Sequence, residues 1–198
     1  MIESDDQIFS ESDQVKFFNE TFGSTELTSR YDKGRDQFDD QVFGLIKEYC
    51  NGEILEIGCG NCRFLRHLLS KIPGISVSGV DLSETGISVC KKTIPQGKFY
   101  SADFFDFISE KKYDVVLCFQ TLEHIRDHIG FLKKMIDACR QGGILIITVP
   151  NKYTDACNQH VHFWDTDEFS YLLGNHVDVV KTVLFNEDQN IVSICKTK

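Results

Sequence analysis

Residues 53–65, EILEIGCGNCRFL, combine two features that could carry chemistry. Cys59 and Cys62 form a Cys-x-x-Cys pair, which is the spacing of a redox dithiol or of half a zinc site. Gly58 and Gly60 belong to a glycine-containing turn, which lets the backbone approach a cofactor closely. The same stretch therefore supports two different chemistries, and the residues around it have to decide between them.

The surrounding residues favour the cofactor interpretation. Residues 53–57 resemble a short strand and the residues after Cys62 a helix, so the glycines would lie at the carboxyl edge of a sheet, where doubly wound folds bind ligands. A nicotinamide fingerprint beginning at Gly58 would need glycine at position 63, which is Arg63. A four-cysteine zinc site would need a second Cys-x-x-Cys pair, and the sequence has none. We interpret Cys59 and Cys62 as small residues of a cofactor loop, and the redox dithiol stays an alternative.

Two carboxylates follow the next strand-like segments. Asp81 ends the run VSGVD, where an acidic residue can bridge ribose hydroxyls. Asp103 follows the run KFYSA and stands beside Phe104, so its carboxylate could accept an exocyclic amine while the ring packs on a base. Either aspartate alone could be a turn former. The glycine turn, Asp81 and Asp103, in this order along the chain, predict a nucleoside cofactor.

A glutamate and three histidines form a second group. Glu123 and His124 follow the strand-like run YDVVLCF, and His160, His162 and Trp164 lie in the loop after GGILIITVP. A histidine of ordinary pKa, about 6.5, can accept a proton at neutral pH, so His124 is our candidate general base, with Glu123 orienting it or the acceptor. His160, His162 and Trp164 are candidate substrate-binding residues. The alternative is that His124 caps a helix and that the loop histidines have no role in catalysis.

Alternating strand-like and helix-like segments must position these residues. Apolar residues recur at helical spacing over residues 38–50, and Asn51-Gly52 then ends the helix. From residue 53 to residue 150 strands alternate with helices, a pattern typical of parallel strands joined by crossover helices. The predicted fold is α/β, a doubly wound and mostly parallel sheet. VDVVKTVLF and NIVSICK, separated only by NEDQ, predict an antiparallel hairpin at the sheet edge.

Composition excludes several classes of protein. The 198 residues carry a formal net charge of -9, which offers no basic surface to nucleic acid. The longest apolar run, residues 144–149, is far shorter than the roughly 20 residues of a membrane span. The N-terminus is acidic where a secretory signal would be basic, and the eight cysteines show no disulfide framework. We therefore expect a cytoplasmic protein with unpaired thiols, no nucleic acid partner and no membrane insertion.

Two regions are expected along the chain. Residues 1–36 mix acidic and aromatic residues with Arg30 and Arg35, whereas the first core-forming helix begins at Phe38. We expect residues 1–36 to form an arm or lid over the active site, and residues 37–198 to form one domain. A solvated acidic tail is the alternative for the N-terminal residues.

Five motifs of this chain resemble, in order, those of class I S-adenosylmethionine-dependent methyltransferases. They are LEIGCGNC, GVDLS, SADF, YDVVLCFQTLEHI and GGILIITVPN, within residues 53–151. The chain is similar to the small-molecule subgroup that resembles ubiquinone-biosynthesis O-methyltransferases. This resemblance implies a Rossmann-like, seven-stranded sheet with a reversed last hairpin, and S-adenosylmethionine as cofactor. Cys62 stands where the family usually has a third glycine.

The resemblance also implies how individual residues contact the cofactor. Glu56 and the backbone of Gly58 to Gly60 would hold the methionine part, Asp81 the ribose and Asp103 the adenine. The full set of predicted cofactor-binding residues is Tyr31, Arg35, Glu56, Gly58, Cys59, Gly60, Asp81, Leu82, Ala102, Asp103, Phe104, Cys118, Phe119 and Gln120. No metal ligand is predicted.

The expected reaction is O-methylation of a hydroxyl or carboxyl group on a small-molecule acceptor. QTLEH and HVHFWDTDEF also resemble the pattern of magnesium-dependent methyltransferases that modify RNA 3′ ends. Gln120 replaces the first acid of that pattern, and a neutral amide is a poorer ligand for a hard cation. Metal-assisted 2′-O-methylation of RNA ends therefore stays an alternative, as does a non-catalytic S-adenosylmethionine-binding protein. The residues do not indicate which acceptor is used or the oligomeric state.

Overall fold

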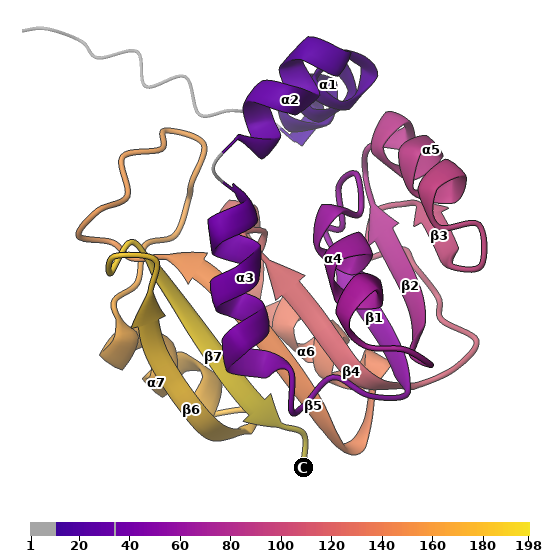
Figure 1. The fold of residues 1–198 in the computed structure, drawn as a ribbon. Helices are drawn as coiled ribbons and strands as arrows, with labels where there is room; N and C mark the ends of the chain where they lie inside the picture. The colour runs from indigo at the N-terminus through magenta and orange to yellow at the C-terminus, as the bar shows by residue number, and fades with distance from the viewer. Residues whose placement is uncertain (1–10, 34) are drawn as a thin grey trace, which may run out of the picture.

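Seven strands form one sheet in the computed structural model, which describes residues 11–33 and 35–198 (Figure 1). The strands are β1 (Glu53–Ile57), β2 (Ser76–Asp81), β3 (Lys98–Ser101), β4 (Tyr113–Phe119), β5 (Cys139–Pro150), β6 (Asp178–Phe185) and β7 (Asn190–Lys196). Their order is β3-β2-β1-β4-β5-β7-β6. Neighbours from β3 to β5 pair in parallel, and β7 runs antiparallel to both β5 and β6. The predicted doubly wound sheet with a reversed C-terminal hairpin is confirmed.

Helices cover both faces of this sheet. They are α1 (Glu11–Gly23), α2 (Thr25–Asp32), α3 (Arg35–Ile46), α4 (Arg63–Lys71), α5 (Glu84–Thr93), α6 (His128–Ala138) and α7 (Thr166–Gly174), with a 3-10 turn η1 (Leu122–His124). One buried apolar cluster joins α3, α4 and α5 to one face, and a second joins α6 and α7 to the other. Burial on both faces explains why the central strands are almost continuously apolar. None of the described helices combines the length and apolar character that crossing a membrane requires.

The alternation of side chains along β1 places one acidic residue between two helices. Leu55 and Ile57 belong to the cluster under α6 and α7, and Ile54 belongs to the cluster under α3 and α4. Because successive side chains of a strand point to opposite faces, Glu56 shares the face of Ile54. Its carboxyl group is therefore directed toward α3 and α4, which carry Asp39 and Arg63.

The expected N-terminal arm is described only in part. Residues 1–10, Gly34 and the side chain of Tyr31 lie outside the described residues, so the contact predicted for Tyr31 stays a prediction. Residues 11–32 form α1 and α2, which Figure 1 shows beyond the sheet, on the side to which β2 and β4 point. Asn19 of α1 accepts hydrogen bonds from the Ser83 hydroxyl at 2.8 Å and from the Thr85 N–H at 3.3 Å. These bonds attach α1 to the beginning of α5.

Candidate cofactor and acceptor site

A cavity of about 420 Å³ lies at the carboxyl ends of β1 to β4, and residues of α1 and α3 complete its wall. The predicted residues that line it are Arg35, Glu56, Gly58, Cys59, Gly60, Asp81, Leu82, Ala102, Asp103, Phe104, Phe119, Gln120 and His124. Cys118 is not among the lining residues, and it packs in the apolar core beneath α6 and α7. Residues from separate motifs therefore meet at one cavity, because parallel strands end at the same edge of the sheet.

Gly58 and Gly60 have left-handed backbones, with φ of 71° and 52°. A Cβ at Gly58 would lie 2.2 Å from Thr121 Oγ1, and one at Gly60 would lie 3.0 Å from the Phe22 ring. The N–H groups of Gly58 and Cys59 both donate to the carbonyl of Val80, at 2.9 and 3.3 Å. The turn therefore needs glycine at both positions, for its backbone conformation and for the close approach of Thr121 and Phe22.

Asp81 joins this turn to the beginning of α5. Its carboxylate accepts hydrogen bonds from the backbone N–H of Gly60 at 2.7 Å and from that of Ser83 at 2.8 Å. Burial raises the pKa of Asp81 above its ordinary value, and the bonds from Ser83 and Gly60 oppose this rise. A carboxylate oxygen can accept more than one hydrogen bond, so Asp81 can hold the turn and also bind hydroxyl groups of a ligand.

Glu56 is a buried acceptor at the cavity wall. Its side chain is 4% exposed, and Oε2 has no hydrogen-bond partner among the described residues. Burial, and then the nearby Asp39, raise the pKa of Glu56 well above its ordinary value. Asp39 pairs with Arg63, yet burial still raises the pKa of Asp39 to about 6. A ligand ammonium group would give Glu56 Oε2 a donor and favour the ionised form of both acids.

Asp103, the predicted contact of the adenine, follows β3 and lies next to aromatic residues in the sequence. Its Oδ1 accepts a hydrogen bond from the Phe105 N–H at 2.8 Å, which shapes the turn after β3. Phe104 and Phe105 both line the cavity, and Phe104 packs edge-on against Phe131 with ring centroids 5.0 Å apart. A carboxylate next to these rings can accommodate a flat heterocycle that carries an amine.

Glu123 does not line the cavity. Its side chain is 1% exposed, and neither carboxyl oxygen has a hydrogen-bond partner among the described residues. Burial raises the pKa of Glu123 to about 8, so the group is neutral at pH 7. Its backbone carbonyl accepts hydrogen bonds from the N–H groups of Val161 and His162, at 2.9 and 3.2 Å. The residue therefore holds the loop after β5 through its backbone.

His124 lines the cavity. Its Nδ1 lies 3.2 Å from the carbonyl oxygen of Gln159, and because a carbonyl can only accept, Nδ1 carries the hydrogen and Nε2 the lone pair. Burial, and then His160 at 4.7 Å between ring centroids, lower the pKa of His124 to about 4. The imidazole is therefore neutral at pH 7, with Nε2 able to accept a proton.

His160 completes a cluster with Glu123 and His124. Its Nδ1 lies 2.6 Å from Asp155 Oδ2, which orients the ring. One ligand atom from each of Glu123, His124 and His160 lies within 4.8 Å of the others. Two imidazoles and a carboxylate at this spacing could hold a divalent cation if the carboxyl group ionised. Burial of Glu123 opposes that ionisation.

The other two predicted substrate-binding residues contact helices instead of the cavity. His162 Nε2 lies 3.0 Å from Nδ1 of His128, and the His162 ring stacks on Trp164 with centroids 5.4 Å apart. Trp164 is 8% exposed and packs against Phe169 of α7. Neither these two residues nor His160 line the cavity; Val161, between the two histidines, does.

Four residues of α1, within the segment expected to form a lid, line the cavity, and none of them was predicted individually: Gln14, Val15, Phe18 and Phe22. Phe18 and Phe22 are four positions apart, and their rings stack with centroids 5.9 Å apart. Two aromatic residues four positions apart in an otherwise acidic segment could have indicated a helix with one face packed against the protein. Arg126, two positions after His124, also lines the cavity and was not predicted.

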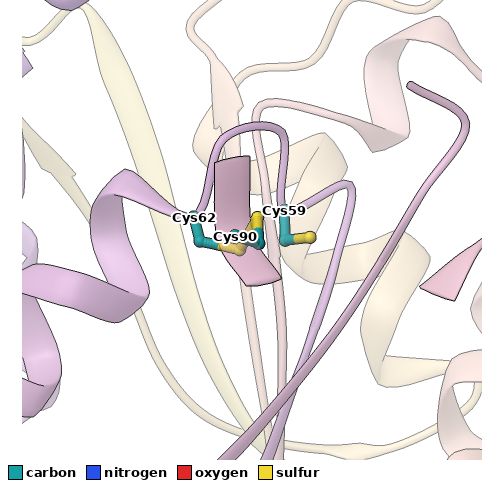
Figure 2. Close-up of side chains that lie close together, drawn as sticks. All are labelled: Cys59, Cys62 and Cys90. Carbon is teal, nitrogen blue, oxygen red and sulfur yellow. A yellow bond between two sulfur atoms is a disulfide. The ribbon is translucent and has the colours of Figure 1, made fainter. Parts of the chain in front are cut away.

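A disulfide joins Cys62 to Cys90 of α5, with their Cα atoms 5.4 Å apart (Figure 2). The prediction of unpaired thiols is therefore wrong for these two residues. Spacing along the chain could not reveal the pair, because α5 returns Cys90 to the glycine turn 28 positions later. Cys59 lies beside the pair in Figure 2 and is a free, buried thiol. The Cys-x-x-Cys residues are therefore not bonded to each other.

Part of the chain matches a known protein family and several curated proteins. A family model described as a methyltransferase domain matches residues 55–145. Trans-aconitate 2-methyltransferase of Acidovorax ebreus (strain TPSY) is 23% identical over 133 residues, which cover 67% of this chain and 52% of that protein. Malonyl-[acyl-carrier protein] O-methyltransferase of Paenibacillus sp. (strain JDR-2) is 31% identical over 116 residues, which cover 52% of this chain and 41% of that protein. The chain thus spans about half the length of the curated relatives it matches.

Solved structures share the fold. The N-methyltransferase NodS from Bradyrhizobium japonicum WM9, in complex with S-adenosyl-L-homocysteine, has a TM-score of 0.74 at 14% identity. The match covers 92% of this chain and 97% of that one. At this identity the similarity establishes the fold alone.

Proposed function

Because the chain belongs to the class I S-adenosylmethionine-dependent methyltransferases, we propose that it transfers the methyl group of S-adenosylmethionine to a hydroxyl or carboxyl group of a small molecule. One observation carries the proposal. A cavity at the carboxyl edge of the sheet brings a buried carboxyl oxygen of Glu56, which has no hydrogen-bond partner among the described residues, together with the glycine turn and Asp81.

The lining residues suit the parts of the cofactor. Glu56 would accept hydrogen bonds from the ammonium group of the methionine part, Asp81 from the ribose hydroxyls, and Asp103 from the adenine amine beside Phe104. The cavity volume of about 420 Å³ is in the range of small-molecule sites. The buried acids favour a ligand that brings hydrogen-bond donors, because an unpaired buried acceptor is destabilising.

The chain contributes to the reaction mainly by positioning the acceptor. When bound, the cofactor supplies an activated methyl group for an in-line displacement, whose barrier falls when the reacting atoms are held in line. His124 would contact the acceptor through Nε2, while its Nδ1 hydrogen bond to Gln159 fixes the ring. A pKa of about 4 makes His124 a weak base. It would help an acceptor hydroxyl to lose its proton, whereas a carboxylate acceptor needs no base.

A carboxylate is therefore the acceptor that this site favours. Arg126, two positions after His124, lines the cavity, and an arginine guanidinium pairs well with carboxylates. Two relatives are named for molecules that carry carboxyl groups, trans-aconitate and malonyl-[acyl-carrier protein]. The net charge of -9 argues against a nucleic acid acceptor.

The N-terminal residues 1–36 would act as the lid of the site. Support comes from Phe18 and Phe22, which line the cavity, and from Asn19, which bonds to the beginning of α5. Because α1 forms part of the cavity wall, movement of α1 would let ligands enter and leave.

Calorimetric titration with S-adenosylhomocysteine tests the cofactor assignment. Wild type should bind, and Glu56→Gln should bind about 10- to 150-fold more weakly, because hydrogen bonds to charged groups are worth about 1.5–3 kcal/mol. Glu48→Gln, at an exposed position on the same chain, controls for the loss of one charge. No heat of binding with wild type would refute the assignment. Release of S-adenosylhomocysteine in the presence of phenols, sugars and carboxylic acids then identifies the acceptor class.

A further inference from the structure

The Cys62–Cys90 disulfide fastens the wall of the proposed cofactor site. Cys62 is the residue at which the glycine turn meets α4, and Cys90 lies on α5, which begins directly after Asp81 and Ser83. Figure 2 shows the two sulfurs joined next to the turn that carries Cys59. Neither Cys62 nor Cys90 lines the cavity, so the bond acts on the site through the backbone.

The bond holds a turn whose conformation is otherwise unfavourable. Cys62 has φ of 58°, in the left-handed region that residues with a Cβ rarely adopt, and its side chain makes no capping hydrogen bond. The Sγ of Cys90 lies 3.4 Å from the carbonyl oxygen of Gly60. On the same helix, a Cβ at Gly86 would lie 2.6 Å from that oxygen, so α5 is packed tightly on the turn.

We propose that Cys62 and Cys90 form a reversible thiol–disulfide site, and that its oxidised form binds the nucleoside cofactor more tightly than its reduced form. The inference rests on the proposed function of the cavity. Cytoplasmic glutathione keeps most thiols reduced, so in the compartment that we expect for this chain the bond would report a shift toward oxidising conditions.

The direction of the effect follows from the strain at Cys62. A left-handed conformation costs about 1–2 kcal/mol for a residue with a Cβ, and reduction would let the turn relax away from it. A ligand would then have to restore the conformation that the disulfide maintains. Converted to affinity, the reduced protein should bind about 5- to 30-fold more weakly.

The exchange needs only low-molecular-weight thiols and disulfides. A thiolate attacks one sulfur of the Cys62–Cys90 bond and forms a mixed disulfide; a second thiolate releases it. Two external thiols thereby become one disulfide, and Cys62 and Cys90 each gain one electron and one proton. The reverse reaction with an external disulfide restores the bond.

Access to the bond depends on α1. Cys62 and Cys90 are both fully buried, and Phe22 of α1 lies against Gly60 and Gly86. A thiol can reach the sulfurs only after the packing around them opens, and the contacts of Phe22 with the glycine turn and α5 are part of that packing. Because coupling between two sites is reciprocal, a ligand that binds the oxidised form more tightly should also shift the equilibrium between the Cys62–Cys90 disulfide and the two thiols toward the disulfide.

Cys59 is the third sulfur of the cluster, and its ligand atom lies within 4.8 Å of those of Cys62 and Cys90. A metal held by three thiolates is therefore the competing use of this site. Burial, and then Asp81 and Glu56, raise the pKa of Cys59 well above its ordinary value. Asp81 and Glu56 also disfavour the negative charge of three thiolates beside them, so a neutral disulfide suits these surroundings better than a three-thiolate metal site.

The test compares oxidised and reduced protein. Wild type is treated with glutathione disulfide or with dithiothreitol, and its thiols are counted after denaturation. Oxidised protein should show the six free cysteines, and reduced protein all eight. Titration with S-adenosylhomocysteine should then give about 5- to 30-fold weaker binding for the reduced form. Cys90→Ala should bind like reduced wild type under both conditions, and Cys50→Ala, which removes a free thiol before β1, should keep the redox response.

Each other outcome overturns the inference. Equal affinity of the two wild-type forms would show that the bond does not act on the cavity. Eight thiols after oxidation would show that the bond does not form. One zinc ion retained by reduced wild type and lost in Cys90→Ala would assign a metal site instead. No binding by either form would refute the proposed function, and this inference with it, although the thiol count would still establish the disulfide.

Discussion

Replacing Glu123 with glutamine should remove a loss of stability that wild type suffers as the pH rises. Burial raises the pKa of Glu123 from 4.5 to about 8. Between these values the folded protein holds a proton that the unfolded chain has released, so rising pH favours unfolding. The stability contribution is complete below pH 4.5 and is lost as the pH rises through about 8. Glutamine does not ionise, so the variant has no such dependence at this position.

The size of this change in unfolding free energy follows from the shift in the pKa of Glu123. One pKa unit corresponds to about 1.4 kcal/mol, so from about pH 5.5 to about pH 7.5 the variant should gain roughly 2–3 kcal/mol in unfolding free energy relative to wild type. Urea unfolding of both proteins at the two pH values measures this change, with equal slopes required for the comparison. Glu110→Gln, at an exposed position, controls for the altered net charge.

A pH-independent difference between the proteins would refute the reasoning. So would a relative loss of stability in Glu123→Gln at the higher pH. A difference that does not change with pH would mean that Glu123 is already ionised in the native protein across this pH range. A divalent cation bound by Glu123, His124 and His160 would require that ionisation, because a cation favours the charged form of a carboxyl ligand.

Four further outcomes follow from the site. Asp81→Ala should weaken S-adenosylhomocysteine binding by about 1–3 kcal/mol in calorimetry, and an unchanged affinity would exclude a ribose contact. His124→Ala should lower turnover of hydroxyl acceptors by about a hundredfold to ten-thousandfold and leave carboxylate acceptors within a few-fold; equal losses for both would contradict a base role. Amide hydrogen exchange of residues 17–36 should slow when S-adenosylhomocysteine is added, and equal exchange would count against a lid. A chelator should leave turnover unchanged, whereas loss that magnesium restores would establish a metal-dependent reaction.

The relative direction of the strands could be predicted because it depends on local patterns. Runs of four to eight apolar residues separated by helical segments permit few arrangements other than parallel pairing through crossovers. The short NEDQ connection could join β6 and β7 only as antiparallel neighbours. The positions of Gly58, Asp81 and Asp103 at one cavity follow from the same rule, since the carboxyl ends of parallel strands share an edge.

Roles that depend on which way a side chain turns could not be predicted in this way. Glu123 and His124 are adjacent in the sequence, but the 3-10 turn that contains them leaves His124 on the cavity wall and Glu123 buried away from it. His162 and Trp164 belong to the expected acceptor loop, yet they contact α6 and α7. A loop after a strand can direct alternate residues toward a cavity or toward the core, and only packing against the helices selects between them.

By itself, the sequence determined the sheet, the glycine turn and the acidic residues at the strand ends, because each depends on periodicity or on a few neighbouring residues. Tertiary structure alone decided which residues of α1 line the cavity and that Cys62 bonds to Cys90 instead of Cys59. These contacts join segments that are separated by whole helices and strands. Their formation depends on how α1 and α5 pack against the glycine turn, and no local pattern along the chain records that packing.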